Sequence, residues 1–257
     1  MPRDRRALVA GVAVVAAGAS LAALWPRGGS TALVSDDFDG PDRLITNEWA
    51  TYNPAAVEAV ASPVWLVTSG SFFARDGAGW TGVPDAGRPD AASERATNSA
   101  VFRAVTRRGD IGDAVVAFRL RLDRFVATPE TPAHPWDGVH VFVRYESERR
   151  LYVVSVDRRD GGVAVKKKVS GGDANGGTYV TLASRGAPAP PGDWHDYAVE
   201  ARSLGNAVAI RLVRDGTVVL ETTDAGVGGP PITGAGRVGL RGDNTEFVVD
   251  DFRVTPE

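Results

Sequence analysis

Three side chains that could take part in chemistry, His140, Ser155 and Lys166, occupy matching positions in three consecutive stretches of alternating polar and apolar residues. A period of two predicts β-strands and places alternate side chains on opposite faces of a sheet. Turns at 146–149 and at Asp160-Gly161 would fold these strands into a meander. The imidazole, hydroxyl and ammonium groups would then form one transverse row on the face opposite a valine-rich core.

An imidazole between a hydroxyl and a cation could act as a general base, so His140 is the candidate catalytic residue. A hydrogen-bonded histidine in a partly buried sheet is the alternative. The three strands are predicted at 138–145, 150–157 and 163–169. Their register pairs Tyr145 with Arg150, His140 with Ser155, and Ser155 with Lys166. In this register Tyr152 and Lys167 lie on the core face.

The outer face of the meander is predicted to be basic. Its cationic side chains are Arg119, Arg121, Arg144, Lys166 and Lys168, with Trp80 and Trp136 at its flanks. Guanidinium groups pair with carboxylates through two hydrogen bonds, and indole rings stack on flat apolar surfaces such as those of sugar rings. This pattern favours an acidic glycan as ligand, and an ordinary exposed sheet face is the alternative.

The carboxylates of the meander favour no hydrolase. Glycoside hydrolysis requires two carboxyl groups at a defined separation, and the meander offers only Glu146, Glu148 and Asp157, at turns or strand ends. We assign no catalytic triad to Ser155, His140 and Asp157, because neither a nucleophile elbow nor an oxyanion loop accompanies them.

Composition indicates a single β-rich domain. The chain has 257 residues, 43% of them hydrophobic, with 30 glycines, 16 prolines and short strands at regular spacing. Its formal net charge of −3 is not that of a general nucleic-acid binder. The absence of cysteine excludes a disulfide framework and a thiolate metal site. We expect a monomer without an organic cofactor.

Residues 1–32 have the layout of an export signal. Arg3, Arg5 and Arg6 precede the apolar run 7–24, and small residues follow at 30–32. We expect this segment to be a helical signal peptide that is removed, which leaves a secreted domain at 33–257. The alternative is an uncleaved membrane anchor, since about 18 apolar residues are the lower limit for crossing a bilayer.

Four local patterns resemble the concanavalin A-like lectin/glucanase jelly roll, a β-sandwich shared with laminin G-like modules. They are SDDFDG with Trp49 shortly after it, VTSGSFF, GDWHDYAVEA followed by RDGTVV, and the closing VGLRGDNTEFVVDDFRV. Together they span nearly all of 33–257. The resemblance implies an antiparallel β-sandwich, a polysaccharide or cell-surface glycan as partner, and binding on the concave sheet.

The resemblance leaves two classes of function open. The first is a carbohydrate-binding domain without catalysis. The second is an enzyme, either a polysaccharide lyase or a hydrolase similar to those acting on 3-keto-disaccharides. A lyase acting on uronates would need a group that neutralises the carboxylate, Arg119 or Arg144, and a base, His140 or Tyr152. The E-x-D-x-x-E run of laminarinase-type hydrolases does not occur.

The resemblance also implies a structural calcium ion between the first and last strands. Carried over to this sequence, its ligands are Asp250 and the carbonyl of Gly70. Five carboxylates fall on the two strands, at Asp36, Asp37, Asp39, Asp250 and Asp251. Calcium prefers oxygen ligands, and exposed edge charge is the alternative explanation of these residues.

Overall fold

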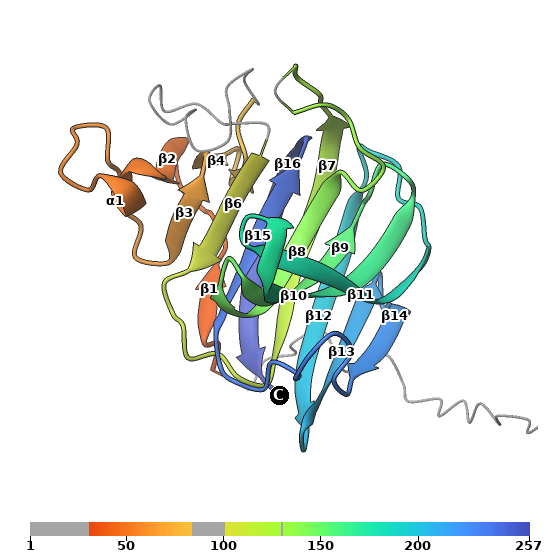
Figure 1. Cartoon of the computed structure of the whole chain (residues 1–257). Coiled ribbons are helices and arrows are strands. Elements are labelled where there is room, and N and C mark those ends of the chain that lie inside the picture. The colour runs from red at the N-terminus through yellow and green to blue at the C-terminus, as the bar shows by residue number, and fades with distance from the viewer. Residues whose placement is uncertain (1–30, 84–100, 130) are drawn as a thin grey trace, which may run out of the picture.

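The computed structural model describes residues 31–83, 101–129 and 131–257, and the predicted signal segment lies almost entirely outside them. The described residues fold into two antiparallel β-sheets packed face to face (Figure 1), which confirms the predicted all-β sandwich. A single turn of helix, α1 (Trp49–Tyr52), lies at one end. Within the described ranges, no helix is long and apolar enough to span a membrane.

The larger sheet has nine strands within the described residues. Eight follow the order β14-β13-β12-β7-β16-β5-β4-β2, and β1 pairs with β16. They are β1 (Val34–Asp36), β2 (Arg43–Asn47), β4 (Ser71–Arg75), β5 (Ala78–Trp80), β7 (Ala114–Phe125), β12 (Trp194–Leu204), β13 (Ala207–Arg214), β14 (Thr217–Asp224) and β16 (Thr245–Pro256). The pairing of β1 with β16 confirms that the first and last strands lie together.

The smaller sheet carries the predicted meander. Its seven strands within the described residues follow the order β11-β10-β9-β8-β15-β6-β3. They are β3 (Trp65–Ser69), β6 (Val101–Thr106), β8 (Gly138–Ser147), β9 (Arg150–Val156), β10 (Gly162–Ala174), β11 (Gly177–Gly186) and β15 (Arg237–Asp243). Strand β15 comes from near the end of the chain and pairs with β8.

The core lies between the two sheets and explains why these strands form. Val139, Val141 and Val143 of β8 belong to the same buried cluster as Phe118 and Leu120 of β7. β-Branched and aromatic side chains fit a pleated surface that is covered on one face. Each such side chain contributes about 1.5–3 kcal/mol when fully buried, so the alternation fixes which face of β8 points outward.

The first hairpin, β8–β9, has the predicted register from Val139 to Val143 and departs from it nearer the turn. His140 pairs with Ser155 and Val141 with Val154, as predicted. The predicted pairing of Tyr145 with Arg150 is wrong, because a bulge after Val143 makes Ser147 the partner of Arg150. A bulge inserts extra residues into one strand and redirects the side chains that follow.

The second hairpin is shifted by two residues from its predicted register. Ser155 pairs with Ala164, and Lys166 pairs with Val153. The connection from 157 to 161 is longer than the predicted two-residue turn, since β9 ends at Val156 and β10 begins at Gly162. A shift of two residues keeps each side chain on its face, so Lys166 still lies on the outer face with Ser155.

Candidate functional site

A cavity of about 290 Å³ lies on the outer face of the smaller sheet, where the predicted row of His140, Ser155 and Lys166 is found. Its lining residues come from β8, β9, β10, β11 and β15 and from the loop before β8. They are Trp136, His140, Phe142, Val153, Ser155, Lys166, Ala174, Tyr179, Arg241 and Asp243. The strands that carry the polar floor are neighbours in the sheet (Figure 1).

A transverse row of paired residues crosses five strands of this sheet, and its first three members, Arg241, His140 and Ser155, line the cavity. Successive pairings join Arg241 to His140, His140 to Ser155, Ser155 to Ala164, and Ala164 to Ser184. Residues that are directly opposite one another in antiparallel strands have Cβ atoms about 4.5–5.5 Å apart on the same face. The row therefore places a guanidinium, an imidazole and a hydroxyl group in direct succession.

His140 is held between a hydroxyl and a carboxylate. Its Nδ1 forms a hydrogen bond with Ser155 Oγ at 2.8 Å, and its Nε2 lies 3.1 Å from Asp243 Oδ2 but is not aligned for a hydrogen bond. Asp243 reaches the ring because its partner on β8 is Gly138, which has no side chain. His140 and Ser155 are both buried, so their mutual contact is shielded from bulk water.

The charges around the ring fix its protonation state. Burial lowers the pKa of His140, and Asp243 only partly offsets this effect, so the imidazole is neutral at neutral pH. Burial opposes ionisation of Asp243, but Arg241 and His140 hold the pKa of this carboxyl well below its usual range. An ionised Asp243 favours the ring proton on Nε2. Nδ1 is then an acceptor, and the Ser155 hydroxyl donates its proton to it.

Two cations border the polar row. Arg241 Nε donates to Asp243 Oδ1 at 2.7 Å. Lys166 lies on β10, opposite Val153 of β9. Burial lowers the pKa of its ammonium group. With two cations, one carboxylate and a neutral histidine, the cavity lining carries an excess of positive charge.

Aromatic rings form the rim of the cavity. Trp136 is 48% exposed, although its ring stacks on His134 at 4.5 Å between centroids with 8° between the planes. Tyr179 of β11 also lines the cavity and is 36% exposed. The buried Lys168 has its Nζ 5.0 Å from the centre of the Tyr179 ring. An exposed indole supported from behind by a second ring is a rigid stacking surface.

Local sequence holds the two walls in place. Asp137 fixes the loop that presents Trp136, because its Oδ2 accepts hydrogen bonds from His134 N at 2.8 Å and Asn244 Nδ2 at 3.1 Å. On the other side, Gly171 and Gly172 have φ angles of 93° and 117°, which disfavour other residues. They allow the β10–β11 hairpin to bend so that Ala174 lines the cavity. Strand β10 therefore continues through this bend to Ala174, and β11 begins at Gly177.

Arg119 and Arg121 do not lie on this face, and their predicted placement is wrong. Both belong to β7 of the larger sheet, where their guanidinium carbons lie 5.0 and 5.1 Å from the centre of the Trp194 ring. Trp80 also belongs to the larger sheet, and its Nε1 donates to Glu246 at 3.1 Å. Alternation identified the outward residues of β7 correctly but could not show to which sheet this strand belongs.

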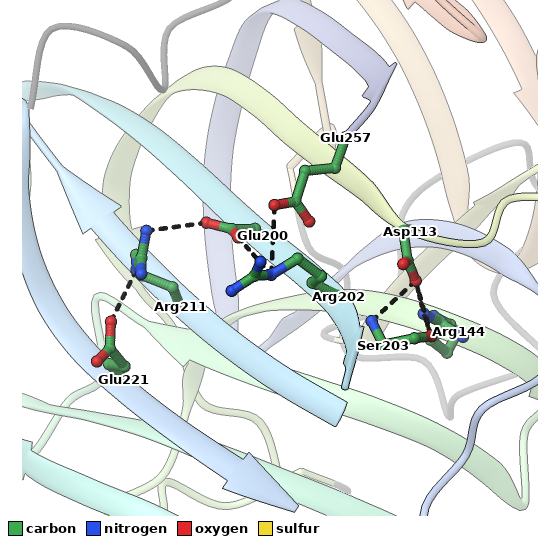
Figure 2. A network of polar contacts seen from close by, with 8 residues as sticks. All are labelled: Asp113, Arg144, Glu200, Arg202, Ser203, Arg211, Glu221 and Glu257. Carbon is green, nitrogen blue, oxygen red and sulfur yellow. Dashed lines mark hydrogen bonds and ion pairs between the residues drawn. The ribbon is translucent and has the colours of Figure 1, made fainter. Parts of the chain in front are cut away.

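Arg144 was predicted on the outer face and is instead buried. It has a φ angle of 50° in the bulge of β8, which turns its side chain toward the end of the sandwich. There it lies beside Asp113 and Ser203 (Figure 2), pairing with the carboxylate and donating to Ser203 Oγ at 3.0 Å. It also donates to the carbonyl of Thr233 at 2.6 Å. Arg144 therefore belongs to an internal polar network and is not available to a ligand in the cavity.

The core-face predictions for Tyr152 and Lys167 are confirmed. Lys167 Nζ lies 2.8 Å from Asp224 Oδ2, and both side chains are fully buried. Tyr152 donates to the same carboxylate oxygen at 2.6 Å. These groups join β10 and β9 of one sheet to β14 of the other.

The two residues carried over for calcium have other contacts in the structure. Asp250 Oδ1 accepts the backbone N–H of Asp251 at 2.8 Å, and its Oδ2 lies 3.7 Å from Arg119. The carbonyl of Gly70 accepts the backbone N–H of Glu48 at 3.2 Å. No cluster of three or more histidine, aspartate and glutamate side chains suited to a metal ion occurs in the part of the chain that the structure describes. A calcium ion at Asp250 and Gly70 stays a prediction.

Sequence reasoning missed Arg241, Asp243 and Tyr179. The run Val238 to Asp243 does carry a signal, because Arg241 and Asp243 alternate with residues whose side chains are apolar or absent. That alternation places them on an outward face. It does not reveal that β15 lies beside β8, and this adjacency is what brings Asp243 to His140.

Comparison with known proteins identifies the fold. No protein-family model matches the sequence, and no curated protein matches it. Among solved structures, an endo-1,3-β-glucanase from Streptomyces sioyaensis is 15% identical with a TM-score of 0.51, covering 90% of this chain and 97% of its own. A β-1,3-glucanase from Mycobacterium marinum is 12% identical with a TM-score of 0.51, covering 89% and 100%. A Bacillus subtilis protein with a galectin-like fold is 12% identical with a TM-score of 0.51, covering 86% and 98%. The chain therefore has the concanavalin A-like jelly-roll fold.

Proposed function

We propose that the protein binds an acidic carbohydrate in the cavity over β8, β9 and β10. The observation that carries this proposal is the exposed Trp136, supported by His134, at the rim of a cavity whose lining has excess positive charge. A sugar ring can stack on the indole while its carboxylate or sulfate meets Lys166 and Arg241. The layout of residues 1–32 supports export, so the glycan would be extracellular.

The shape of the cavity supports a ligand with both apolar and polar faces. Phe142 and Val153 form an apolar patch of the lining, next to the polar row of His140 and Ser155. Pyranose rings present C–H groups on one side and hydroxyl groups around their edge. Small-molecule sites are typically apolar with a few placed polar groups, and this lining has that composition.

Isothermal titration calorimetry with matched neutral and uronate-containing oligosaccharides tests the proposal. The full-length protein should bind the uronate form more tightly, and added salt should reduce the difference. Trp136→Ala should weaken binding of both forms by about three- to tenfold, since an aromatic contact contributes about 0.5–1.5 kcal/mol beyond its buried area. Lys166→Ala combined with Lys168→Ala should weaken only uronate binding, because Lys166 lines the cavity and the buried Lys168 lies against Tyr179 at its rim. A charge contact open to solvent contributes about 0.2–1 kcal/mol.

Arg119→Ala is the matched control for charge. This arginine lies on the larger sheet, so its loss should leave the affinity unchanged. Equal affinity for neutral and uronate oligosaccharides, unaffected by the double lysine change, would place the glycan site elsewhere and contradict the proposal.

A further inference from the structure

Neither ring nitrogen of His140 is open to a ligand in the cavity, and this restricts what the residue can do. Nδ1 lies 2.8 Å from Ser155 Oγ, and Nε2 is buried 3.1 Å from Asp243 Oδ2, without the alignment of a hydrogen bond. Before Ser155 reacts, a ligand in the cavity therefore cannot exchange a proton with the ring directly. The first step in which His140 can act on a ligand runs through the Ser155 hydroxyl, which also lines the cavity.

We propose that Ser155 is a nucleophile for acyl transfer, with His140 as its base and Asp243 as the residue that positions the base, and that the site hydrolyses an O-acyl ester. That the alcohol of this ester is a sugar rests on the proposed glycan binding. The arrangement has the three parts that an activated serine needs: a hydroxyl within hydrogen-bond reach of a base, and a third group that orients the base. The acid is Asp243 of β15, not the Asp157 considered from the sequence.

The reaction balances with water as the only co-substrate. Ser155 Oγ attacks the ester carbonyl carbon, and its proton passes to His140 Nδ1. The tetrahedral intermediate collapses, the sugar alkoxide leaves with the proton from Nδ1, and the acyl group remains on Ser155. Water then attacks the acyl-enzyme while His140 takes its proton, and the carboxylic acid leaves as Ser155 regains a proton from the ring.

The surroundings of Ser155 supply the remaining requirements. Its partner on β10 is Ala164, whose small side chain adds little bulk beside the hydroxyl. Lys166 lies on the same face two residues further along β10, where its ammonium can stabilise the negative charge that develops on the carbonyl oxygen. Phe142 and Val153 offer an apolar surface for a short acyl chain.

The site differs from familiar serine hydrolases in one respect of geometry. There the serine faces Nε2 and the aspartate faces Nδ1, whereas here the two nitrogens are exchanged. Each imidazole nitrogen can accept a proton while the other holds one, so the exchange does not alter the chemistry. An ionised Asp243 stabilises the imidazolium formed during attack from either nitrogen.

Covalent labelling with a fluorophosphonate probe tests this inference, because the probe reacts with activated serine hydroxyls and needs no glycan. Incubation of the full-length protein should add one probe, and peptide mass spectrometry should locate it on Ser155. The protein should also release 4-nitrophenol from 4-nitrophenyl acetate. His140→Gln should slow labelling by about 100-fold or more, the usual contribution of a general base.

Ser184 is the matched control, since it lies on the same face and in the same transverse row but is exposed and two strands away from Ser155. Ser184→Ala should label and turn over like the wild type, whereas Ser155→Ala should do neither. In Ser155→Ala the circular dichroism must be unchanged and uronate affinity must stay within about fivefold of the wild type, so loss of label can be assigned to the hydroxyl. Should Ser155→Ala fold poorly, labelling of the wild type at Ser155 and not at Ser184 decides the question.

A pH profile of the labelling rate tests the role of Asp243. The groups that face His140 are Ser155, Asp243, Arg241 and Lys166. Asp243 raises the pKa of the ring, so Asp243→Asn should shift the midpoint of the rate profile to lower pH as well as slow the reaction. A purely structural role would leave the midpoint unmoved. Absence of labelling in a wild-type protein that binds uronates would overturn the acyl-transfer inference and leave glycan binding intact.

Discussion

Replacing Lys167 by methionine is expected to destabilise the sandwich strongly. Lys167 Nζ lies 2.8 Å from Asp224 Oδ2 and donates to the carbonyl of Gly229 at 2.6 Å, and neither charged side chain is exposed. Removing one partner of a buried ion pair costs about 3–5 kcal/mol, because the other charge remains buried and unpaired. Asp224 keeps hydrogen bonds from Tyr152, Gly226 and Val227, so we expect a loss near the lower end, about 3 kcal/mol.

The loss should depend on pH in a defined direction. Burial opposes ionisation of Asp224, but Lys167 and Tyr152 keep its pKa below the ordinary value. In the wild type, this carboxylate therefore contributes stability above about pH 4, which is lost as the pH falls through its folded pKa. Without Lys167, burial raises the pKa of Asp224. The difference in stability between wild type and Lys167→Met should therefore shrink between pH 7 and pH 4.

Urea unfolding followed by tryptophan fluorescence at pH 7 and pH 4 measures both the loss of stability and its pH dependence. In a thermal melt at pH 7, a loss of about 3 kcal/mol corresponds to a fall in melting temperature of about 6–12 °C for a domain of this size. Lys166→Met is the matched control, since this lysine of the same strand lies on the outer face and is partly exposed, and it should change stability by less than about 1 kcal/mol. A Lys167→Met protein within 1 kcal/mol of the wild type at pH 7, or a loss that does not shrink at pH 4, would refute this reasoning.

Three further predictions concern stability, ligand binding and metal. Arg144→Met should lower the free energy of unfolding by about 1.5–3 kcal/mol, because it removes the hydrogen bonds that the buried guanidinium donates to Asp113, Ser203 and Thr233, whereas Arg119→Met should change it by less than about 1 kcal/mol; urea titration distinguishes the two. Burial lowers the pKa of Lys168 to about 8, so wild-type affinity for uronates should fall between pH 7 and pH 9, and calorimetry should find a smaller fall in Lys168→Ala. If calcium is held by Asp250 and Gly70, a chelator should lower the melting temperature; an unchanged melt, with no metal found by elemental analysis, would contradict that prediction.

The fold and the central row could be predicted because both depend on local pattern. Alternation over β8 and β9 fixes which side chains point outward, and the pairing of His140 with Ser155 follows from a hairpin of adjacent strands. The predicted register of β10 against β9 was wrong by two residues. The face predicted for Lys166 is nevertheless correct, because side chains along a strand alternate with a period of two. Errors of an even number of residues therefore leave a predicted face intact.

The acid of the site could not be predicted, because it depends on which strands become neighbours. Strand β15 enters the smaller sheet between β8 and β6, far from β8 along the chain. That order is set by packing of the whole sandwich and not by any local signal. The same limit explains the misplacement of Arg119 and Arg121, whose strand belongs to the other sheet. The prediction for Arg144 was wrong for a different reason, because a bulge in β8 reverses the direction of its side chain.

The direction of the Ser155 proton separates binding from chemistry at this site. With Nε2 protonated toward Asp243, the hydroxyl donates to Nδ1 and can serve a bound glycan only as an acceptor. Loss of this one hydrogen-bond acceptor should change the free energy of glycan binding by about 1 kcal/mol or less. The same orientation is what a nucleophile requires, since the proton already lies on the path to its base. Ser155→Ala should therefore bind uronates almost as well as the wild type while losing all reaction with the fluorophosphonate. A protein in which this substitution abolishes glycan binding and leaves labelling unchanged would reverse both assignments.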